Sequence, residues 1–220
     1  MTYFNKKNMI KLDIISDVMC PWCIIGFRRL EKAIEEMGIQ DQVEIEWQPF
    51  ELNPNMPSEG EEIQEHITRK YGSTLEQSKK SQELLTSLGA EVGFTFDYFD
   101  GMHIVNSREA HVLLQYAKEQ GKQTELNIRF MEAFFSERKD VSKREILLQE
   151  VEKIGLDKNE ALNRLNDKNA LDEIQNIENY WQSLGVSSVP TIVFNRTSAL
   201  NGAQPVEVYK QVLTEILEQK

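Results

Sequence analysis

The first fifty residues combine two different spacings of apolar side chains. Residues 9–17 alternate and then become continuously apolar, which predicts a strand entering a buried sheet. Apolar residues then recur at helical spacing from Pro21 to Met37, and Gly38 directly after them is a natural helix end. Residues 43–49 alternate between apolar and polar side chains, as a second strand would. The pattern therefore predicts a strand–helix–strand unit.

A long helical region follows this unit. The segment 53–57 contains asparagine and proline and predicts a turn. From residue 58 to about residue 180 almost every stretch has helical periodicity, and glycines separate the stretches. The predicted helices cover residues 61–71, 75–92, 108–119, 123–137, 143–154, 158–164 and 170–184.

The last forty residues return to a strand pattern. Residues 190–195 predict a short buried strand, residues 197–201 a hairpin partner, and residues 206–217 a closing amphipathic helix. The order is thus α/β, then all-α, then β-β-α.

No linker composition and no internal repeat separates these parts. A single α/β domain with a helical insertion accounts for this better than three consecutive domains. We expect the domain to comprise residues 1–57 and 181–220. The insertion, residues 58–180 with the return helix 170–184, should pack over the Cys20 face as a cap.

Composition narrows the class of protein. A chain of 220 residues with 40% hydrophobic content can build a real core, so disorder is not expected. The net charge of −11, without a basic patch, argues against nucleic-acid and membrane partners. No apolar run is long enough to span a membrane, and residues 1–11 do not resemble a secretory signal. We therefore expect a cytoplasmic protein.

The chain has two cysteines, Cys20 and Cys23, at the start of the first predicted helix. Residues three apart lie on one helix face, so the two thiols can close a small ring without moving the backbone. Free N–H groups and the dipole at a helix start favour an anion, so we expect a thiolate at an exposed Cys20. Cys23, one turn further in, should be less exposed and suits a resolving thiol.

Two structural roles compete with this redox role. A disulfide between residues three apart closes a minimal loop and gains little stability, although two buried structural cysteines are a possible alternative. A structural zinc needs four ligands, and His66, His103 and His111 lack ligand-like spacing. The location after a strand and at a helix start favours redox chemistry, and no metal site is predicted.

Several further segments match the pattern of a known family. They are Ser16-Asp17-Val18-Met19-Cys20-Pro21-Trp22-Cys23, Phe50-Glu51-Leu52-Asn53-Pro54, Asn106-Ser107 with Ala110-His111, Val189-Pro190, and Asn201-Gly202-Ala203-Gln204-Pro205. With these segments the chain resembles the DsbA family of the thioredoxin fold, and more narrowly its FrnE-like branch. That branch is related to 2-hydroxychromene-2-carboxylate isomerases and kappa-class glutathione transferases. The matches cover nearly the whole chain.

The resemblance implies an α/β, thioredoxin-like fold with a large all-helical insertion. It implies that the Val189–Pro190 bond is cis and lies beside the cysteines, where Val189 offers its backbone to a substrate strand. It also implies that Cys20 attacks and Cys23 resolves. Supporting roles at the active site are expected for Pro21, Trp22, Val189, Pro190, Asp17, Asn53, Asn106 and His111.

The chain departs from the family pattern at two positions. Many thioredoxin-fold oxidoreductases carry a buried acid six residues before the first cysteine, where this chain has Ile14. Asp17 stands closer to the cysteines, but it could equally be a loop carboxylate without a chemical role. Ser188 stands where the branch often has glycine, which leaves the Val-Pro pair intact.

Two other candidates have a simpler explanation. His111 falls near the apolar face of its predicted helix, where a hydrogen-bonded core residue is the more common role. The aromatic cluster of Phe94, Phe96, Tyr98 and Phe99 is expected in the core, with the lining of a substrate groove as the alternative.

These observations favour a thiol–disulfide oxidoreductase that acts on protein or low-molecular-weight thiols and disulfides. It would need no dissociable cofactor, although glutathione could be a co-substrate. One alternative is a glutathione-dependent isomerase or transferase, against which the intact cysteine pair argues. Another is a non-catalytic holdase that grips exposed peptides beside Pro190. Monomer and homodimer are both compatible with the sequence.

Overall fold

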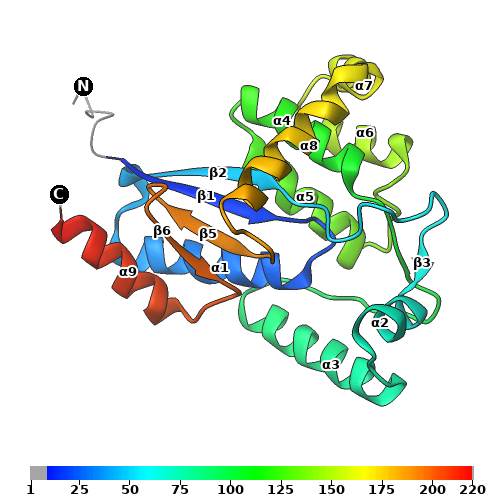
Figure 1. Ribbon diagram of the computed structural model, residues 1–220, viewed down its shortest axis with the longest axis horizontal. Helices are drawn as coiled ribbons and strands as arrows, with labels where there is room; N and C mark the ends of the chain where they lie inside the picture. The colour runs from blue at the N-terminus through cyan, green and yellow to red at the C-terminus, as the bar shows by residue number, and fades with distance from the viewer. Residues whose placement is uncertain (1–8, 220) are drawn as a thin grey trace.

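The computed structural model describes residues 9–219. Its main sheet has the strand order β2-β1-β5-β6 and draws on both ends of the chain (Figure 1). Strands β1 (Ile10–Ser16) and β2 (Val43–Pro49) are parallel, whereas β5 (Thr191–Phe194) is antiparallel to β1. Strand β6 (Ser198–Asn201) completes a hairpin with β5. The expectation that the amino- and carboxy-terminal strands share one sheet is confirmed.

Alternation along β1 supplies both faces of this sheet. Ile10, Leu12 and Ile14 belong to the core shared with helix α1 (Pro21–Met37), and helix α9 (Val206–Glu218) packs beside α1. Ile15 faces the other way and packs with Trp181 of helix α8 (Lys168–Ser183). The sheet is therefore a layer between α1 and α9 on one face and α8 on the other (Figure 1).

Helix α1 has the limits predicted from the sequence. Pro21 occupies the first turn, and Gly38 ends the helix in the left-handed conformation with φ 66°, which glycine adopts without steric cost. A 3-10 turn (Gln40–Gln42) then leads into β2.

The helical insertion divides into two parts. The first part contains α2 (Ile63–Tyr71) and α3 (Leu75–Glu91). A capping box between Thr74 and Gln77 begins α3. The second part contains α4 (Arg108–Glu119), α5 (Gln123–Phe135), α6 (Arg144–Lys153), α7 (Lys158–Asn166) and α8. Figure 1 shows the two parts on different sides of the end of the sheet.

The second part is attached to the sheet through β2. The Gln123 side chain pairs with the Trp47 backbone, since its Oε1 accepts from Trp47 N at 2.9 Å and its Nε2 donates to Trp47 O at 2.9 Å. Thr124 Oγ1 accepts from the Trp47 indole N–H at 2.9 Å. The start of α5 thus covers the outer edge of the sheet, where a free strand would invite pairing with another chain.

Two expectations need correction. The helix expected at 61–71 begins at Ile63, because β3 (Glu61–Glu62) pairs instead with β4 (His103–Ile104) in a second, two-stranded sheet. The expected cap over the Cys20 face comes mainly from α2 and α3 with Phe135 of α5, whereas α4 and α8 pack against β2. The division at residues 57 and 181 stays a prediction.

Candidate active site

The two cysteines lie where the sequence placed them. Cys20 is the residue that precedes α1, and Cys23 lies in its first turn. Both are free thiols, and Cys23 N donates to Cys20 O at 3.1 Å. Cys23 is 0% exposed and Cys20 only 4% exposed, so the expectation of an exposed Cys20 is wrong. Its thiol is reached through a cavity and not from open solvent.

The environment of Cys23 keeps its thiol protonated. Burial raises the pKa of Cys23 well above its ordinary value, and the neighbouring Cys20 raises it further. The Ser16 hydroxyl and the Asp17 backbone act in the opposite direction without reversing the shift. Such a thiol is inert at rest and must lose a proton before it reacts.

The Val189–Pro190 segment forms the second side of the site. Its peptide bond is cis, and Cys20 Sγ lies 3.8 Å from Val189 O. Pro190 also lies against α1 at Gly26, where a Cβ would come within 3.3 Å of both Pro190 and Ala203. Glycine at this position therefore lets α1 approach the proline closely, whereas a Cβ would require Pro190 or Ala203 to move by a few tenths of an ångström.

A cavity of about 370 Å³ opens beside Cys20. One side is formed by Asn53, Val189 and residues 19–22, which we call the cysteine loop. Side chains from α2 and α3 form the other side. Most of the lining is apolar, with Leu85 and Phe135 among the deeper residues. Ser78 also lines the cavity, and its Oγ is buried without a hydrogen-bond partner among the described residues. The cavity can thus take a mainly apolar group.

Polar groups also surround the mouth of this cavity. Lys70 Nζ donates to Leu52 O at 2.8 Å and to Asn53 Oδ1 at 2.7 Å, and burial lowers the pKa of Lys70. Burial and the charge of Cys20 raise the pKa of Tyr98, which lines the cavity. The site thus holds one cation near Cys20 and a tyrosine that stays protonated at neutral pH.

The aromatic cluster has both of its expected roles. Phe94 and Phe96 are buried in the core, with ring centroids 4.8 Å apart. Only Tyr98 among the four lines the cavity. Phe99 packs instead under the Arg138 guanidinium at 4.7 Å.

Asp17 and His111 are brought together behind the cysteine loop. Asp17 is 1% exposed and His111 2% exposed, and His111 Nε2 lies 3.5 Å from Asp17 Oδ1. Burial lowers the pKa of His111, but Asp17, Glu178 and Glu51 outweigh it and raise the pKa above its usual range. Asp17 is thus a buried carboxylate in the loop before α1, and a chemical role for it stays a prediction.

The remaining support residues are less central. Asn106 is not among the cavity residues, and its Oδ1 accepts from Arg108 N at 2.9 Å at the start of α4. Trp22 and Pro21 line the cavity mouth.

The sequence reasoning missed Lys70, Ser78, Glu51 and Glu178 as site residues. Glu51 lies inside one of the matching segments, which could have drawn attention to it. Glu178 and Ser78 occupy ordinary positions on amphipathic helices, which carry no local signal.

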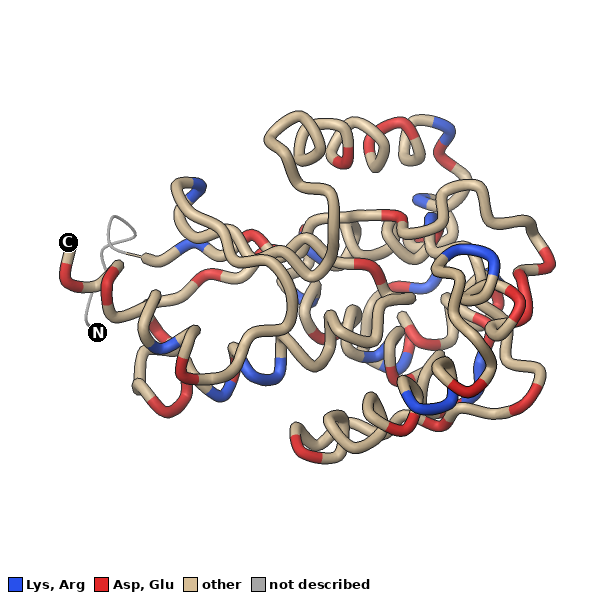
Figure 2. The backbone as a smooth tube through the Cα atoms, turned by 60° about the horizontal axis from the view of Figure 1, so that its bottom comes forward, with Lys and Arg blue, Asp and Glu red and all other residues tan. Residues whose placement is uncertain are grey.

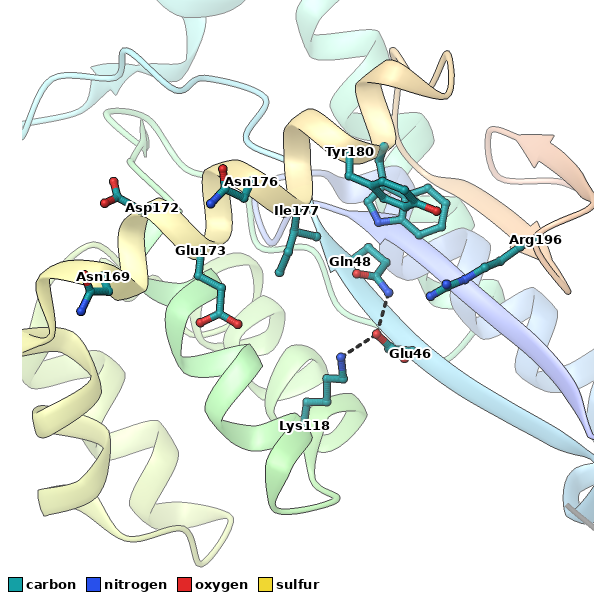
Figure 3. Close-up of a pocket in the computed structure, with 11 residues that line it drawn as sticks. Glu46, Gln48, Lys118, Asn169, Asp172, Glu173, Asn176, Ile177, Tyr180 and Arg196 are labelled. Atoms are coloured by element: carbon teal, nitrogen blue, oxygen red, sulfur yellow. Dashed lines mark hydrogen bonds and ion pairs between the residues drawn. The ribbon is translucent and has the colours of Figure 1, made fainter.

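A second hollow of about 580 Å³ lies on the α8 face of the sheet (Figure 3). It contains no cysteine and is lined mainly by charged and amide side chains, such as Glu46, whose Oε1 accepts from Lys118 Nζ at 2.6 Å. Nearby, the buried Asp13 carboxylate accepts from Gln48 Nε2 at 2.7 Å and pairs with Arg196. These contacts join the strands to α4 and to the β5–β6 turn, and they offer no redox group.

Charge and metal chemistry add little to the site. Figure 2 shows basic residues interspersed with acidic ones along the helices. Within residues 9–219, no group of three or more His, Cys, Asp and Glu side chains could hold a metal ion. None of the helices in this range is both long and apolar enough to cross a membrane.

Comparison with known proteins shows which family the chain belongs to. Residues 11–214 match the sequence profile of the DSBA-like thioredoxin domain. The Bacillus subtilis protein YwbO is 26% identical over 220 residues, covering 96% of this chain and 98% of YwbO. The crystal structure of a probable DsbA oxidoreductase from Streptomyces coelicolor is 31% identical, with a TM-score of 0.90. The match covers 96% of this chain and 91% of the Streptomyces coelicolor chain.

Two further structures share the fold at lower identity. A 2-hydroxychromene-2-carboxylate isomerase is 16% identical with a TM-score of 0.71, covering 95% of this chain and 97% of its own. The cytosolic disulfide reductase DsbM of Pseudomonas aeruginosa, solved with GSH, is 19% identical with a TM-score of 0.65. The match covers 94% of this chain and 99% of the DsbM chain.

Proposed function

Because the chain belongs to the DsbA-like thioredoxin family, we propose that it is a thiol–disulfide oxidoreductase that works through Cys20 and Cys23. The family and its thioredoxin-like fold with a helical insertion confirm what the sequence predicted. One observation carries the proposal: Cys20 Sγ lies at a helix start, 3.8 Å from Val189 O and at the wall of a cavity.

The reaction follows from the two different thiols. The Cys20 thiolate, favoured by the free N–H groups of α1, attacks one sulfur of a substrate disulfide. A Cys20–substrate bond forms, and the other substrate sulfur leaves as a thiolate. Cys23 then loses its proton and attacks Cys20 Sγ, which releases the second substrate thiol. The substrate gains two electrons and the cysteine pair becomes a disulfide; the reverse sequence oxidises a dithiol.

The substrates we propose are protein or low-molecular-weight thiols and disulfides. Val189 O faces the attacking sulfur, where an extended substrate segment can meet it. Glutathione is a proposed co-substrate, since the DsbM neighbour was solved with GSH. The same neighbour is named as cytosolic, in agreement with the cytoplasmic location we propose. No dissociable cofactor enters the reaction.

Three variants separate this proposal from its competitors. Cys20→Ser should abolish the reduction of insulin disulfides and the oxidation of a dithiol peptide. Cys23→Ser should keep alkylation at Cys20 and accumulate mixed disulfides, which mass spectrometry detects. A conservative Ser188→Ala change, beside the intact Val-Pro pair, is the matched control and should retain turnover.

The competing functions predict different outcomes. If the protein is a glutathione-dependent isomerase or transferase, the Cys23→Ser variant would retain that isomerase or transferase activity, because one thiol suffices for the reaction. If the protein is a holdase, the Cys20→Ser variant would still prevent the aggregation of an unfolded client protein. In that case neither the wild-type protein nor the variant would turn over a disulfide. Faster labelling of Cys23 than of Cys20 by iodoacetamide would reverse the two roles.

A further inference from the structure

Asp17 holds a fixed carboxylate behind the cysteine loop. Its Oδ1 accepts from Met19 N at 3.1 Å, and its Oδ2 accepts from Leu52 N at 2.7 Å. Its backbone carbonyl accepts from Cys20 N at 2.9 Å. The carboxylate is therefore held by the two segments that frame the cysteine pair. An uncompensated negative charge at this place would oppose a thiolate at Cys20.

His111 reaches the same carboxylate from α4. Its Nε2 lies 3.5 Å from Asp17 Oδ1 and has no hydrogen-bond partner among the described residues. Buried polar atoms are nearly always paired, and a shift of a few tenths of an ångström would pair this one with Asp17. His111 is thus poised to donate to the carboxylate behind Cys20.

The other charges around His111 favour a proton on the imidazole. Glu178 Oε1 from α8 accepts from Glu51 N at 2.5 Å, and Glu51 Oε1 accepts from Arg108 Nε at 2.8 Å. Of the three buried carboxyl groups Asp17, Glu51 and Glu178, only Glu51 forms an ion pair with an Arg or Lys among the described residues, namely Arg108, and buried charge without compensation is costly. The pKa of His111 is raised, as is that of Glu178, which burial and Glu51 both raise.

Other charges near α4 lie elsewhere. Its ion pairs with α6 and α7, Arg144–Glu109 and Arg164–Glu119, are partly exposed to solvent. Lys70 donates to the cavity residues Leu52 and Asn53, and the charges of both Asp17 and Cys20 act on it.

We propose that protonated His111 neutralises Asp17 and thereby stabilises the reduced protein, in which Cys20 is a thiolate. This inference rests on the proposed redox function. His111 touches neither the substrate nor the sulfurs and is a positioning residue. Reduction and protonation are then coupled: the thiolate favours a proton on His111, and a proton on His111 favours the thiolate.

The direct test needs no substitution. The imidazole signals of His111 can be titrated by NMR in the disulfide and the dithiol forms. We expect a higher titration midpoint in the reduced protein. Equal midpoints in the two forms would overturn the inference, since the coupling must act in both directions. This measurement needs only that the cysteine pair can be oxidised and reduced, so it does not depend on the natural substrate.

Substitutions test the direction of the effect. In His111→Gln the equilibrium with glutathione should move about tenfold toward the disulfide form, or about 30 mV. The pH midpoint for alkylation of Cys20 should rise as well. Adding Asp17→Asn to His111→Gln should restore both values toward wild type, because no carboxylate is left to neutralise. His103→Gln is the matched control, since His103 is exposed and contacts Gly101 O.

The variants also separate a charge effect from a loss of packing. A purely structural role predicts a lower melting temperature of His111→Gln with unchanged redox equilibrium and alkylation midpoint, and that result would overturn the inference. If His111→Gln does not fold, Asp17→Asn alone decides, because loss of the carboxylate should lower the His111 titration midpoint in both forms, and an unchanged midpoint would overturn the inference. Loss of turnover in Cys20→Ser tests the redox function separately.

Discussion

The two parts of the helical insertion differ in how deeply they are built into the protein. Helix α4 buries seven of its twelve residues, whereas α3 buries only Ser78, Leu85 and Gly89 of its seventeen. The α4–α8 part holds the outer strand and supplies His111 and Glu178 to the buried charged groups behind Cys20. The α2–α3 part forms the far wall of the cavity. One part therefore packs behind Cys20, and the other lines the cavity beside it.

The largest expected effect is on stability in the second part. Phe130 of α5 lies fully buried in the core, so Phe130→Ala should lower the free energy of unfolding by about 3–5 kcal/mol. Leu85→Ala in α3 removes a smaller side chain beside an existing cavity and should cost about 2 kcal/mol. Urea unfolding followed by circular dichroism measures both. Equal losses would mean that the two parts are equally built into the core.

The next effect concerns substrate access in the first part. Leu85→Trp should fill the cavity beside Cys20 and lower kcat/KM for a bulky disulfide by about tenfold, or about 1.4 kcal/mol. Leu84→Trp, at the exposed neighbouring position, is the control and should leave kcat/KM unchanged. If both variants behave alike, the cavity is not the route to Cys20.

The reduction potential should depend on the cysteine loop more than on either part of the insertion. Trp22 brings an indole N–H but no positive charge to the pair, so the potential should lie some tens of millivolts below about −120 mV, the value of strongly oxidising DsbA. Trp22→His should make the protein more oxidising, since a histidine there can stabilise the thiolate. Glutathione titration measures both proteins, and a wild-type value at or above −120 mV would contradict the expectation.

The smallest effect concerns the junction between β2 and α4. Burial opposes ionisation of Glu46, but hydrogen bonds from Lys11, Lys118 and Gln48 prevail and lower its pKa to about 2. A lowered folded pKa stabilises the fold above the unfolded value of 4.5, and the gain is lost as pH falls toward 2. Glu46→Gln should therefore cost about 1 kcal/mol at pH 7.

The matched measurement is the same unfolding experiment at lower pH. The difference between Glu46→Gln and wild type should shrink steadily between about pH 5 and pH 2. A difference that stays constant with pH would mean that the lost contact is not the ionised carboxylate.

Local patterns were sufficient for much of this fold. Helices α1 and α4 and strand β2 have the predicted limits, because periodicity and helix-ending residues act within a few positions. The β3–β4 pairing was missed because two-residue strands have no periodicity of their own, and their partners lie about forty residues apart.

The site was predictable only in part for the same reason. The cysteine motif and the Val-Pro segment are short and carry their chemistry in sequence. The low exposure of Cys20 depends on Val189 and on residues of α2 and α3, which no local pattern connects to it. Likewise, Asp17 and His111 carry no sign that they meet, because their contact depends on how α4 packs behind the cysteine loop.

The central position of β1 has a consequence for synthesis on the ribosome. Strand β1 hydrogen-bonds to β5, which is made more than 170 residues later, about 10 to 35 seconds at ordinary elongation rates. During that interval one edge of β1 has no partner, and Val189 does not yet stand beside Cys20. A nascent chain thus carries both cysteines before Val189 and Pro190 have been made. Chaperone contact, and exchange of the free dithiol with other disulfides, should concentrate in this interval, so translation pauses late in the message would prolong it.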